Sequence, residues 1–170
     1  MNPKQIKRTK ALATLNWVFV IFMVVANVLA LIVTQSVNNK INANPGSFPE
    51  NFSMEFGLTM TLFLVYAWFF QGAYALAAIA LAVVKNLSVK KQKICIADKV
   101  ISCLTVLLFV APCYFGIGQL AVIFKAMSCG AGFGFIPYVV SLFLQLAVVV
   151  LNVVHAFATK AKPTEVVLEA

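Results

Sequence analysis

The chain consists of long apolar stretches separated by short polar segments. None of the apolar stretches contains Asp, Glu, Lys or Arg, and they cover residues 11–34, 57–84, 100–124 and 131–158. A membrane-spanning helix needs about 20 consecutive apolar residues, which each stretch supplies. In hydrocarbon every backbone amide must find a partner within the chain, and a continuous apolar run achieves this as a helix. The pattern therefore predicts an all-α fold, a polytopic membrane protein with a bundle of four transmembrane helices.

The segments outside these stretches are too short to form a domain of their own. They comprise an N-terminal segment at 1–10, connections at 35–56, 85–99 and 125–130, and a tail at 159–170. A segment of this size cannot bury an independent hydrophobic core. We therefore expect one transmembrane domain over residues 11–158, with function residing in the helices, the loops or what they bind.

The composition agrees with this class. Hydrophobic residues make up 62% of the 170-residue chain and charged residues 11%, whereas soluble domains contain about 25% charged residues. A water-soluble globule of this composition would expose more apolar surface than a monomer tolerates. Four cysteines are too few for a disulfide scaffold, and the alternation of a membrane β-barrel is missing. An integral, multi-pass membrane protein remains.

Basic residues predict the orientation. Of the 13 Lys and Arg residues, only Lys40 and Lys125 lie outside the N-terminal segment, the 85–99 connection and the tail. The positive-inside rule therefore places both termini and the middle connection in the cytoplasm. The expected location is the plasma membrane or an endomembrane vesicle. A nucleic-acid partner is not expected, because no folded basic surface exists to present these charges.

The middle connection is also a candidate for contact with anionic lipid on the cytoplasmic face. A lysine near a negatively charged leaflet contributes about 1 kcal/mol to membrane attraction. The lysines expected to do so are Lys85, Lys90, Lys91 and Lys93.

Polar residues inside the predicted spans fall into two groups by depth. Counted from the helix ends, the group near mid-membrane is Asn27, Gln71 and Gln145. The group at the depth of the cytoplasmic leaflet is Asn16, Asn152 and His155. Matching depths predict hydrogen bonds between the first, second and fourth helices, worth about 0.6 kcal/mol each on average. A polar pathway for an ion or a small solute is the alternative interpretation.

Small residues line part of the second predicted helix. Gly72 opens the run GAYALAAIALA, in which Ala73 and Ala77, and again Ala78 and Ala82, are spaced four residues apart. This spacing lets two helix backbones approach closely. These residues are candidates for a tight contact, either within the chain, with another membrane protein or with a second copy.

Aromatic residues form a cluster earlier in the same helix, at Tyr66, Trp68, Phe69 and Phe70. They lie deeper than the aromatic belt that marks a membrane interface. Packing against protein is one interpretation of this cluster, and contact with a sterol or another lipid is the alternative.

Two residues are candidates for covalent modification. Asn51 begins an Asn-Phe-Ser sequon on the side that the charge rule makes lumenal or extracellular, which makes it a glycosylation candidate. Cys95 lies beside a lysine-rich stretch at a membrane surface, which makes it a candidate for palmitoylation. The first outer connection, 35–56, contains no cysteine, which argues against ectodomains held by disulfides, as in claudins and tetraspanins.

The sequence does not predict an enzyme. His155 is the only histidine, and no Asp, Glu or Cys stands three or four residues from it, as a metal site on one helix face would require. The five acidic residues all lie outside the apolar spans. No nucleophile with a base and no carboxylate pair is expected at membrane depth, and no cofactor is predicted.

Short motifs give the chain a resemblance to a known family. The run Leu15-Asn16-Trp17-Val18-Phe19-Val20-Ile21-Phe22 resembles the first helix of MARVEL-type tetraspans of the synaptophysin and synaptogyrin group. Asp98 at the entry to the third span, Lys125 after it, and Gly132-Phe133-Gly134-Phe135 at the start of the fourth are similar to that group as well. The outer connections lack its paired cysteines, so the resemblance implies a general role in membrane organisation or vesicle traffic.

Three function classes follow from these observations. The first is a non-enzymatic tetraspan protein that organises membrane microdomains or vesicle traffic through lateral protein and lipid contacts. The second is an accessory structural subunit of a larger membrane complex, such as a channel, a pump or a respiratory assembly. The third is a self-assembled channel, which requires a water-filled axis lined by Asn27, Gln71 or Gln145.

Overall fold

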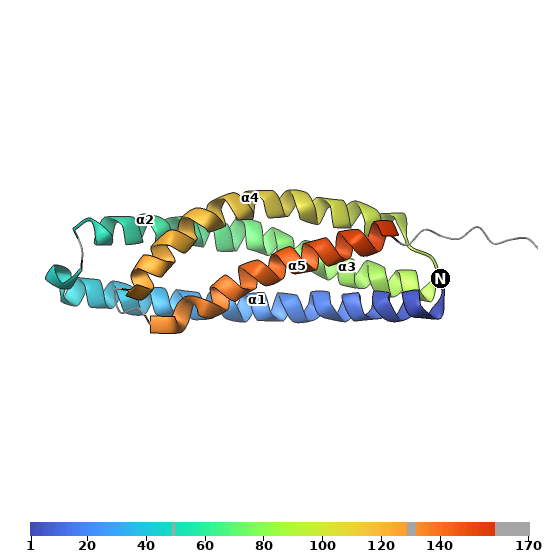
Figure 1. Ribbon diagram of the computed structural model, residues 1–170, viewed down its shortest axis with the longest axis horizontal. Helices are drawn as coiled ribbons and strands as arrows, with labels where there is room; N and C mark the ends of the chain where they lie inside the picture. The colour runs from blue at the N-terminus through green and yellow to red at the C-terminus, as the bar shows by residue number, and fades with distance from the viewer. Residues whose placement is uncertain (49, 129–131, 159–170) are drawn as a thin grey trace, which may run out of the picture.

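The computed structural model describes residues 1–48, 50–128 and 132–158, and within these ranges the chain is helical without any strand. The all-α prediction is confirmed. The elements in chain order are α1 (Pro3–Ala43), η1 (Pro45–Ser47), α2 (Phe52–Val65), η2 (Tyr66–Gln71), α3 (Gly72–Lys90), α4 (Ile96–Ala126), η4 (Gly132–Phe135) and α5 (Ile136–Ala158). The π-helical turn η2 joins α2 and α3 into one continuous rod (Figure 1).

Long helical rods lie side by side over most of the length of the molecule (Figure 1). Helix α1 packs chiefly against α3 and α5, and α4 packs against the same two helices. Consequently α1 lies diagonally opposite α4, and α3 lies diagonally opposite α5. We call the end where α1 begins and α5 ends the terminal end, and the end where α1 ends and α2 begins the hairpin end.

Three helical segments of the described residues are long and apolar enough to cross a membrane: Pro3–Ala43, Phe69–Lys90 and Phe133–Ala158. They contain or overlap the predicted spans 11–34, 57–84 and 131–158, of which residue 131 lies outside the described part. The remaining predicted span, 100–124, falls within α4, but its side chains at 111–119 and 122 lie outside the described part. The predicted tail at 159–170 also lies outside the described residues.

Helix α1 begins well before the apolar stretch that predicted it. The Asn2 side chain accepts from the backbone N–H of Gln5 at 2.8 Å, and the Gln5 side chain accepts from the N–H of Asn2 at 3.0 Å. This capping box satisfies two amide groups that a helix end otherwise leaves without partners. Pro3 follows at the first helical position, where a missing N–H costs nothing. Residues 3–10, expected as a separate segment, are therefore part of the helix.

The turn between α3 and α4 is short and tightly bonded. Gln92 adopts a left-handed conformation with φ 49°, its N–H donates to the carbonyl of Val89 at 3.2 Å, and the Lys93 N–H donates to the carbonyl of Ser88 at 3.1 Å. These two bonds form a Schellman motif, which ends a helix by satisfying its last carbonyls. The α-amino group of Met1 donates to the Gln92 carbonyl at 2.8 Å. The terminal end thus brings the start of α1 to the α3–α4 turn.

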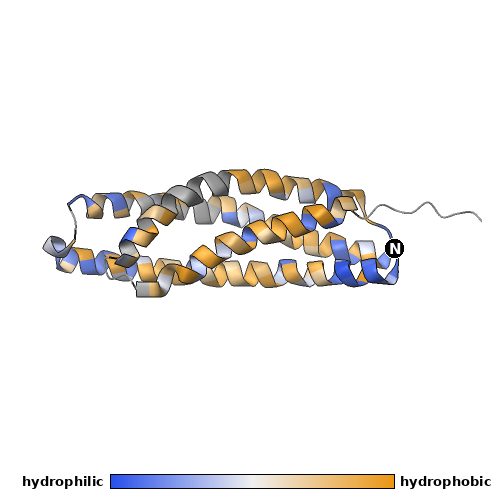
Figure 2. Cartoon of the chain, viewed as in Figure 1, coloured by the Kyte–Doolittle hydropathy of each residue, from blue (hydrophilic) through white to orange (hydrophobic). Residues whose placement is uncertain are grey.

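The distribution of polarity is inverted relative to a soluble protein. Large apolar side chains such as Ile21, Leu107 and Phe143 are exposed, whereas Asn152 and Lys85 are buried. Figure 2 shows the hydrophilic residues gathered toward the two ends of the molecule, with apolar residues over the length between them. This is the arrangement expected where hydrocarbon surrounds the middle of the protein.

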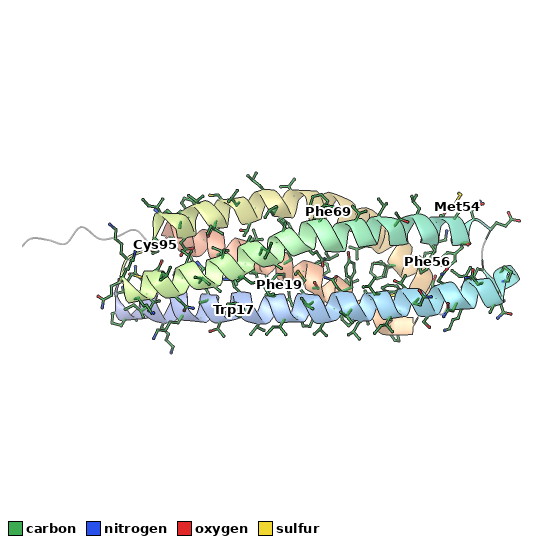
Figure 3. All side chains as sticks on the ribbon, turned by 180° about the vertical axis from the view of Figure 1, so that it is seen from behind. Trp17, Phe19, Met54, Phe56, Phe69 and Cys95 are labelled. Carbon is green, nitrogen blue, oxygen red and sulfur yellow. The ribbon has the colours of Figure 1, made fainter. Side chains whose placement is uncertain are left out.

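Two hydrophobic clusters fill the interior between the helices, and Figure 3 labels one buried ring from each, Phe19 and Phe56. The terminal cluster consists of Phe19, Met23, Tyr74, Ala78, Val148 and Val149. The hairpin cluster consists of Ala30, Val37, Ile41, Phe52, Phe56, Ile123, Phe135 and Tyr138. Polar layers lie on either side of the terminal cluster, and they form the candidate site.

Candidate functional site

A buried ion pair joins α3 to α4 near the terminal end. The Lys85 Nζ lies 2.8 Å from the Oδ1 of Asp98, and both side chains are 0% exposed. The Ser102 hydroxyl donates to the same oxygen at 3.4 Å. The second oxygen, Oδ2, is buried and has no hydrogen-bond partner among the described residues. The two charges therefore depend on each other, because neither has water to solvate it.

The expectation that Lys85 contacts anionic lipid is wrong. The apolar stretch ends at residue 84, which places Lys85 in a connection, but α3 continues to Lys90. Lys85 is consequently a helical residue whose side chain is directed at Asp98. Lys90, Lys91 and Lys93 are exposed at the terminal end, and their contact with anionic lipid stays a prediction.

A hydroxyl and an imidazole join α1 to α5 at the same end. The Thr9 oxygen lies 2.9 Å from Nε2 of His155. The Thr9 hydroxyl also lies 2.8 Å from the carbonyl of Gln5, and when it donates there its oxygen accepts from Nε2 of His155. His155 also lies within electrostatic range of Lys85 and Asp98. Thr9, Lys85, Asp98, Ser102 and His155 together form what we call the charged layer.

The sequence predicts only some of the residues of the charged layer as site residues. The sequence does not mark Thr9 and Ser102 as site residues, because a hydroxyl near the end of an apolar stretch is a weak indication of a polar contact. Asp98 appeared only through the family resemblance. The available signal was the opposite charge of Lys85 and Asp98 on two consecutive helices joined by a short turn.

A pair of amides lies farther from the terminal end than the charged layer. Like Thr9 and His155, it joins α1 to α5. Asn16 donates from Nδ2 to Oδ1 of Asn152 at 3.1 Å, and Asn152 donates back to Asn16 at 3.0 Å. Each amide also donates to a carbonyl of its own helix, Asn16 to Leu12 at 2.9 Å and Asn152 to Val148 at 2.7 Å. Both side chains are buried with donors and acceptor satisfied, which favours one fixed rotation of α1 against α5.

A second polar layer lies between the two hydrophobic clusters. Asn27 of α1 donates from Nδ2 to Oε1 of Gln71, the last residue of η2. The hydroxyl of Tyr74 donates to the backbone carbonyl of Gln145 across the bundle at 3.5 Å. Ser141 lies one turn before Gln145 on α5 and is buried. We call Asn27, Gln71, Ser141 and Gln145 the middle polar layer.

The hairpin end is closed by a different type of contact. Lys125 at the end of α4 lies 2.6 Å from Oε2 of Glu55 in α2, and the two side chains are 40% and 44% exposed. Beneath this pair the rings of Phe48, Phe52 and Phe56 stack in sequence, with centroids 5.4 and 5.7 Å apart. This end is held by aromatic packing, with an ion pair at its surface.

The small residues of α3 divide between the interior and the surface. Ala78 and Ala82 are buried, and Ala78 belongs to the terminal cluster together with Phe19 of α1. Gly72, Ala73 and Ala77 are partly exposed, and open space surrounds Gly72 where a Cβ would lie. The close approach between α1 and α3 therefore involves the later part of the run.

Of the aromatic cluster, Phe69 is exposed and points outward from the rod, as does Met54 (Figure 3), and Phe70 packs against the hairpin cluster. The side chains of Tyr66 and Trp68 lie outside the described part. The same applies to the side chain of Gln119, one of the polar residues of the predicted third span.

Both modification candidates lie at helix starts. Asn51 is exposed, adopts φ 66° and immediately precedes α2. Cys95 is partly exposed at the start of α4, where its N–H donates to the hydroxyl of Ser88 at 3.1 Å. Glycosylation of Asn51 and palmitoylation of Cys95 stay predictions.

The chemistry of the polar layers is that of helix pairing. Within the described residues the polar layers contain amides, hydroxyls, one imidazole and one ion pair. The same residues include no group of three His, Cys, Asp or Glu side chains placed to hold a metal ion. Interhelical hydrogen bonds of this kind select which helices pair and in which rotation. Comparison with protein-family models, with curated proteins and with solved structures finds no match to this chain. Its function is therefore inferred from its own geometry.

Proposed function

We propose that all four helical rods cross the bilayer as a four-helix bundle, with both termini on the cytoplasmic side. The inverted polarity of the bundle supports this arrangement. Contacts of Met1 with Gln92 and of Thr9 with His155 bring the start of α1, the α3–α4 turn and the end of α5 to the terminal end. The exposed basic residues of the same end give it the charge of a cytoplasmic face. They are Lys4, Lys7, Arg8, Lys10, Lys90, Lys91, Lys93 and Lys99.

Labelling of single cysteines tests this topology. The experiment uses a chain whose native cysteines are replaced. In it, Lys91→Cys should react with a membrane-impermeant maleimide only after the membrane is permeabilised, so that the reagent reaches the cytoplasmic face. Asn44→Cys at the hairpin end, which is exposed like Lys91, should react from the opposite face. Labelling of both positions from one face would overturn the four-span arrangement.

We infer that the protein acts as a non-enzymatic organiser of its membrane through lateral contacts, as the MARVEL-like resemblance implies. One observation carries this inference: α1 presents an exposed stripe of β-branched residues at alternating spacings of three and four. The stripe consists of Val18, Ile21, Val25, Val28 and Ile32. Such spacing places side chains along one helix face in the pattern that packs against a second helix. No described residue of the same chain covers these side chains.

The accessory-subunit interpretation predicts the same stripe with a different occupant, so stoichiometry decides between them. The tagged full chain, purified in a mild detergent, should give complexes with several copies of itself in native mass spectrometry. One copy beside unrelated chains would instead favour the subunit role. A single copy carrying lipid alone would overturn lateral protein association.

Cross-linking in the native membrane provides a matched test of the stripe itself. Val25→Cys, in the stripe, is expected to form an oxidative dimer or an adduct with a partner. Leu107→Cys on α4, which is also exposed but lies on another helix, serves as the control. Equal cross-linking at both positions would indicate random collision and would remove α1 as the contact face.

A further inference from the structure

Three polar atoms of the middle polar layer, on three different elements, are buried and have no hydrogen-bond partner among the residues that the structure describes. They are Oδ1 of Asn27 on α1, Nε2 of Gln71 on η2 and Oγ of Ser141 on α5. The Gln71 side chain is 0% exposed and that of Ser141 is 1% exposed. Native interiors rarely leave such groups without hydrogen bonds, since each loses its contact with water and gains nothing in return. Each such atom calls for a bonding group that the described residues do not supply.

These atoms occupy one level of the bundle. On α1, Met23 before Asn27 belongs to the terminal cluster, and Ala30 after it belongs to the hairpin cluster. On α5, which runs in the opposite direction, Tyr138 before Ser141 belongs to the hairpin cluster, and Val148 beyond it belongs to the terminal cluster. The polar side chains of both helices therefore lie between the same two apolar clusters.

The remaining contacts place Gln71 at that level too. Gln71 bonds directly to Asn27. Tyr74, one turn further along the same rod, reaches across to the carbonyl of Gln145, and Ser141 lies one turn before Gln145. Because both rods run toward the terminal end, Gln71 and Ser141 stand at nearly equal heights on diagonally opposite helices. The π-helical turn that ends at Gln71 changes the rotation of the rod there, and π-turns are frequent at functional sites.

The chemistry of the three atoms defines the ligand. Nε2 of Gln71 can only donate, Oδ1 of Asn27 can only accept, and the Ser141 hydroxyl can do both. Among the described residues the charged side chains lie toward the ends, in the charged layer and in the Glu55–Lys125 pair, so the middle layer offers no counter-charge to an ion. A neutral group that both accepts and donates a hydrogen bond fits this set.

We propose that the middle polar layer is a binding site for a hydroxyl group, supplied either by water or by a neutral alcohol dissolved in the membrane. The hydroxyl oxygen accepts from Nε2 of Gln71, and its proton is donated to Oδ1 of Asn27 or to Oγ of Ser141. A water molecule donates to both acceptors at once, and a buried water typically makes about three such bonds. The site is independent of the lateral contacts of α1.

Nuclear magnetic resonance of the full chain in lipid nanodiscs tests the site. With 15N-labelled glutamine, the side-chain amide of Gln71 is assigned by its disappearance in Gln71→Met. A through-space cross-peak from that amide to water is expected if water is the ligand. A cross-peak to added 1-decanol protons, with loss of the water peak, is expected if an alcohol displaces it. Decane, which has no hydroxyl, serves as the control. Contact with neither hydroxyl source would overturn the proposal.

A second measurement does not depend on assignment of the amide. If a hydroxyl is bound, Ser141→Ala removes one of its partners and should lower the thermal midpoint of unfolding and abolish the hydroxyl contact at Gln71. If the site is empty, the same change removes an unpartnered polar atom and should raise the midpoint. Ser36→Ala, at an exposed position of α1, is the matched control and should leave both readings unchanged. A raised midpoint in Ser141→Ala would contradict the proposal.

Discussion

Lys85 and Asp98 form an ion pair between α3 and α4 in which neither side chain is exposed. The pair spans the short turn that ends α3, so it connects two consecutive rods close to the terminal end. A buried pair contributes little net stability compared with apolar residues, but one partner left alone is strongly unfavourable. Correct packing of α3 against α4 should therefore require both residues of the pair.

Removal of one charge is predicted to destabilise the bundle strongly. Lys85→Met leaves the Asp98 carboxylate buried without its partner, which should lower the free energy of unfolding by about 3–5 kcal/mol. The double variant Lys85→Met with Asp98→Leu should recover most of that loss, because no charge then stays buried. Reversible unfolding of the purified protein in mixed micelles measures both values.

The Glu55–Lys125 pair is the internal control for this experiment. It has a similar short distance, but both side chains are partly exposed. Lys125→Met should therefore cost no more than about 1 kcal/mol, and salt should reduce the difference further. Equal costs for Lys85→Met and Lys125→Met would show that burial does not control the first pair.

The amide pair between α1 and α5 is predicted to couple two residues that are distant in sequence. Asn16→Ala and Asn152→Ala each leave the other amide without its two interhelical bonds. A double-mutant cycle should return a coupling energy of about 1 kcal/mol, within the range measured for membrane hydrogen bonds. Asn16→Ala paired with Asn86→Ala, an exposed residue of α3, should give additive effects. Additivity for Asn16 with Asn152 would contradict the observed contact.

The Asn16–Asn152 pair shows which structural features the sequence predicts and which it does not. Counting along the predicted spans gives the depth of Asn16 and Asn152, because an apolar helix has a fixed rise per residue. It does not give the rotation of each helix about its axis, so it does not reveal whether two residues of equal depth face each other. Rotation is set by the packing of all the rods together, which no single stretch encodes.

The ends of the helices do not coincide with the ends of the apolar stretches. The apolar stretches locate hydrocarbon depth, whereas helices end at capping groups, here Asn2 with Gln5 and the left-handed Gln92. Lys85 lies between these two boundaries, beyond the apolar stretch but inside the helix, so the apolar pattern alone places it wrongly at the lipid surface. The π-helical turn before Gly72 is not predicted by any residue pattern in the apolar stretch.

Gly134 is predicted to be required for the contact between η4 and α1. A Cβ at this position would clash with the side chain of Val33. Gly134→Ala should therefore destabilise the protein by about 1–3 kcal/mol, the cost of overpacking, and Val33→Ala in the same chain should recover part of it. Gly72→Ala, where a Cβ meets open space, should be neutral or stabilising by up to about 1 kcal/mol, because alanine favours the helix. Thermal unfolding in detergent compares the three variants, and equal midpoints for Gly134→Ala and Gly72→Ala would refute the close approach.

The exposed lysines of the α3–α4 turn are predicted to retain anionic lipid, and Lys85 is not. Replacing Lys90, Lys91 and Lys93 together by Gln removes about 1 kcal/mol of attraction per residue near a charged leaflet, which corresponds to about 100-fold weaker retention in total. Mass spectrometry of lipids that copurify from bilayers containing anionic and neutral lipid measures the change. Lys40→Gln, an exposed position on α1 near the hairpin end, should leave the anionic fraction unchanged, because that end faces the opposite leaflet in the proposed topology. An equal loss with Lys40→Gln would mean that the two ends of the bundle do not differ in lipid preference, and it would count against both the lysine contact and the proposed orientation.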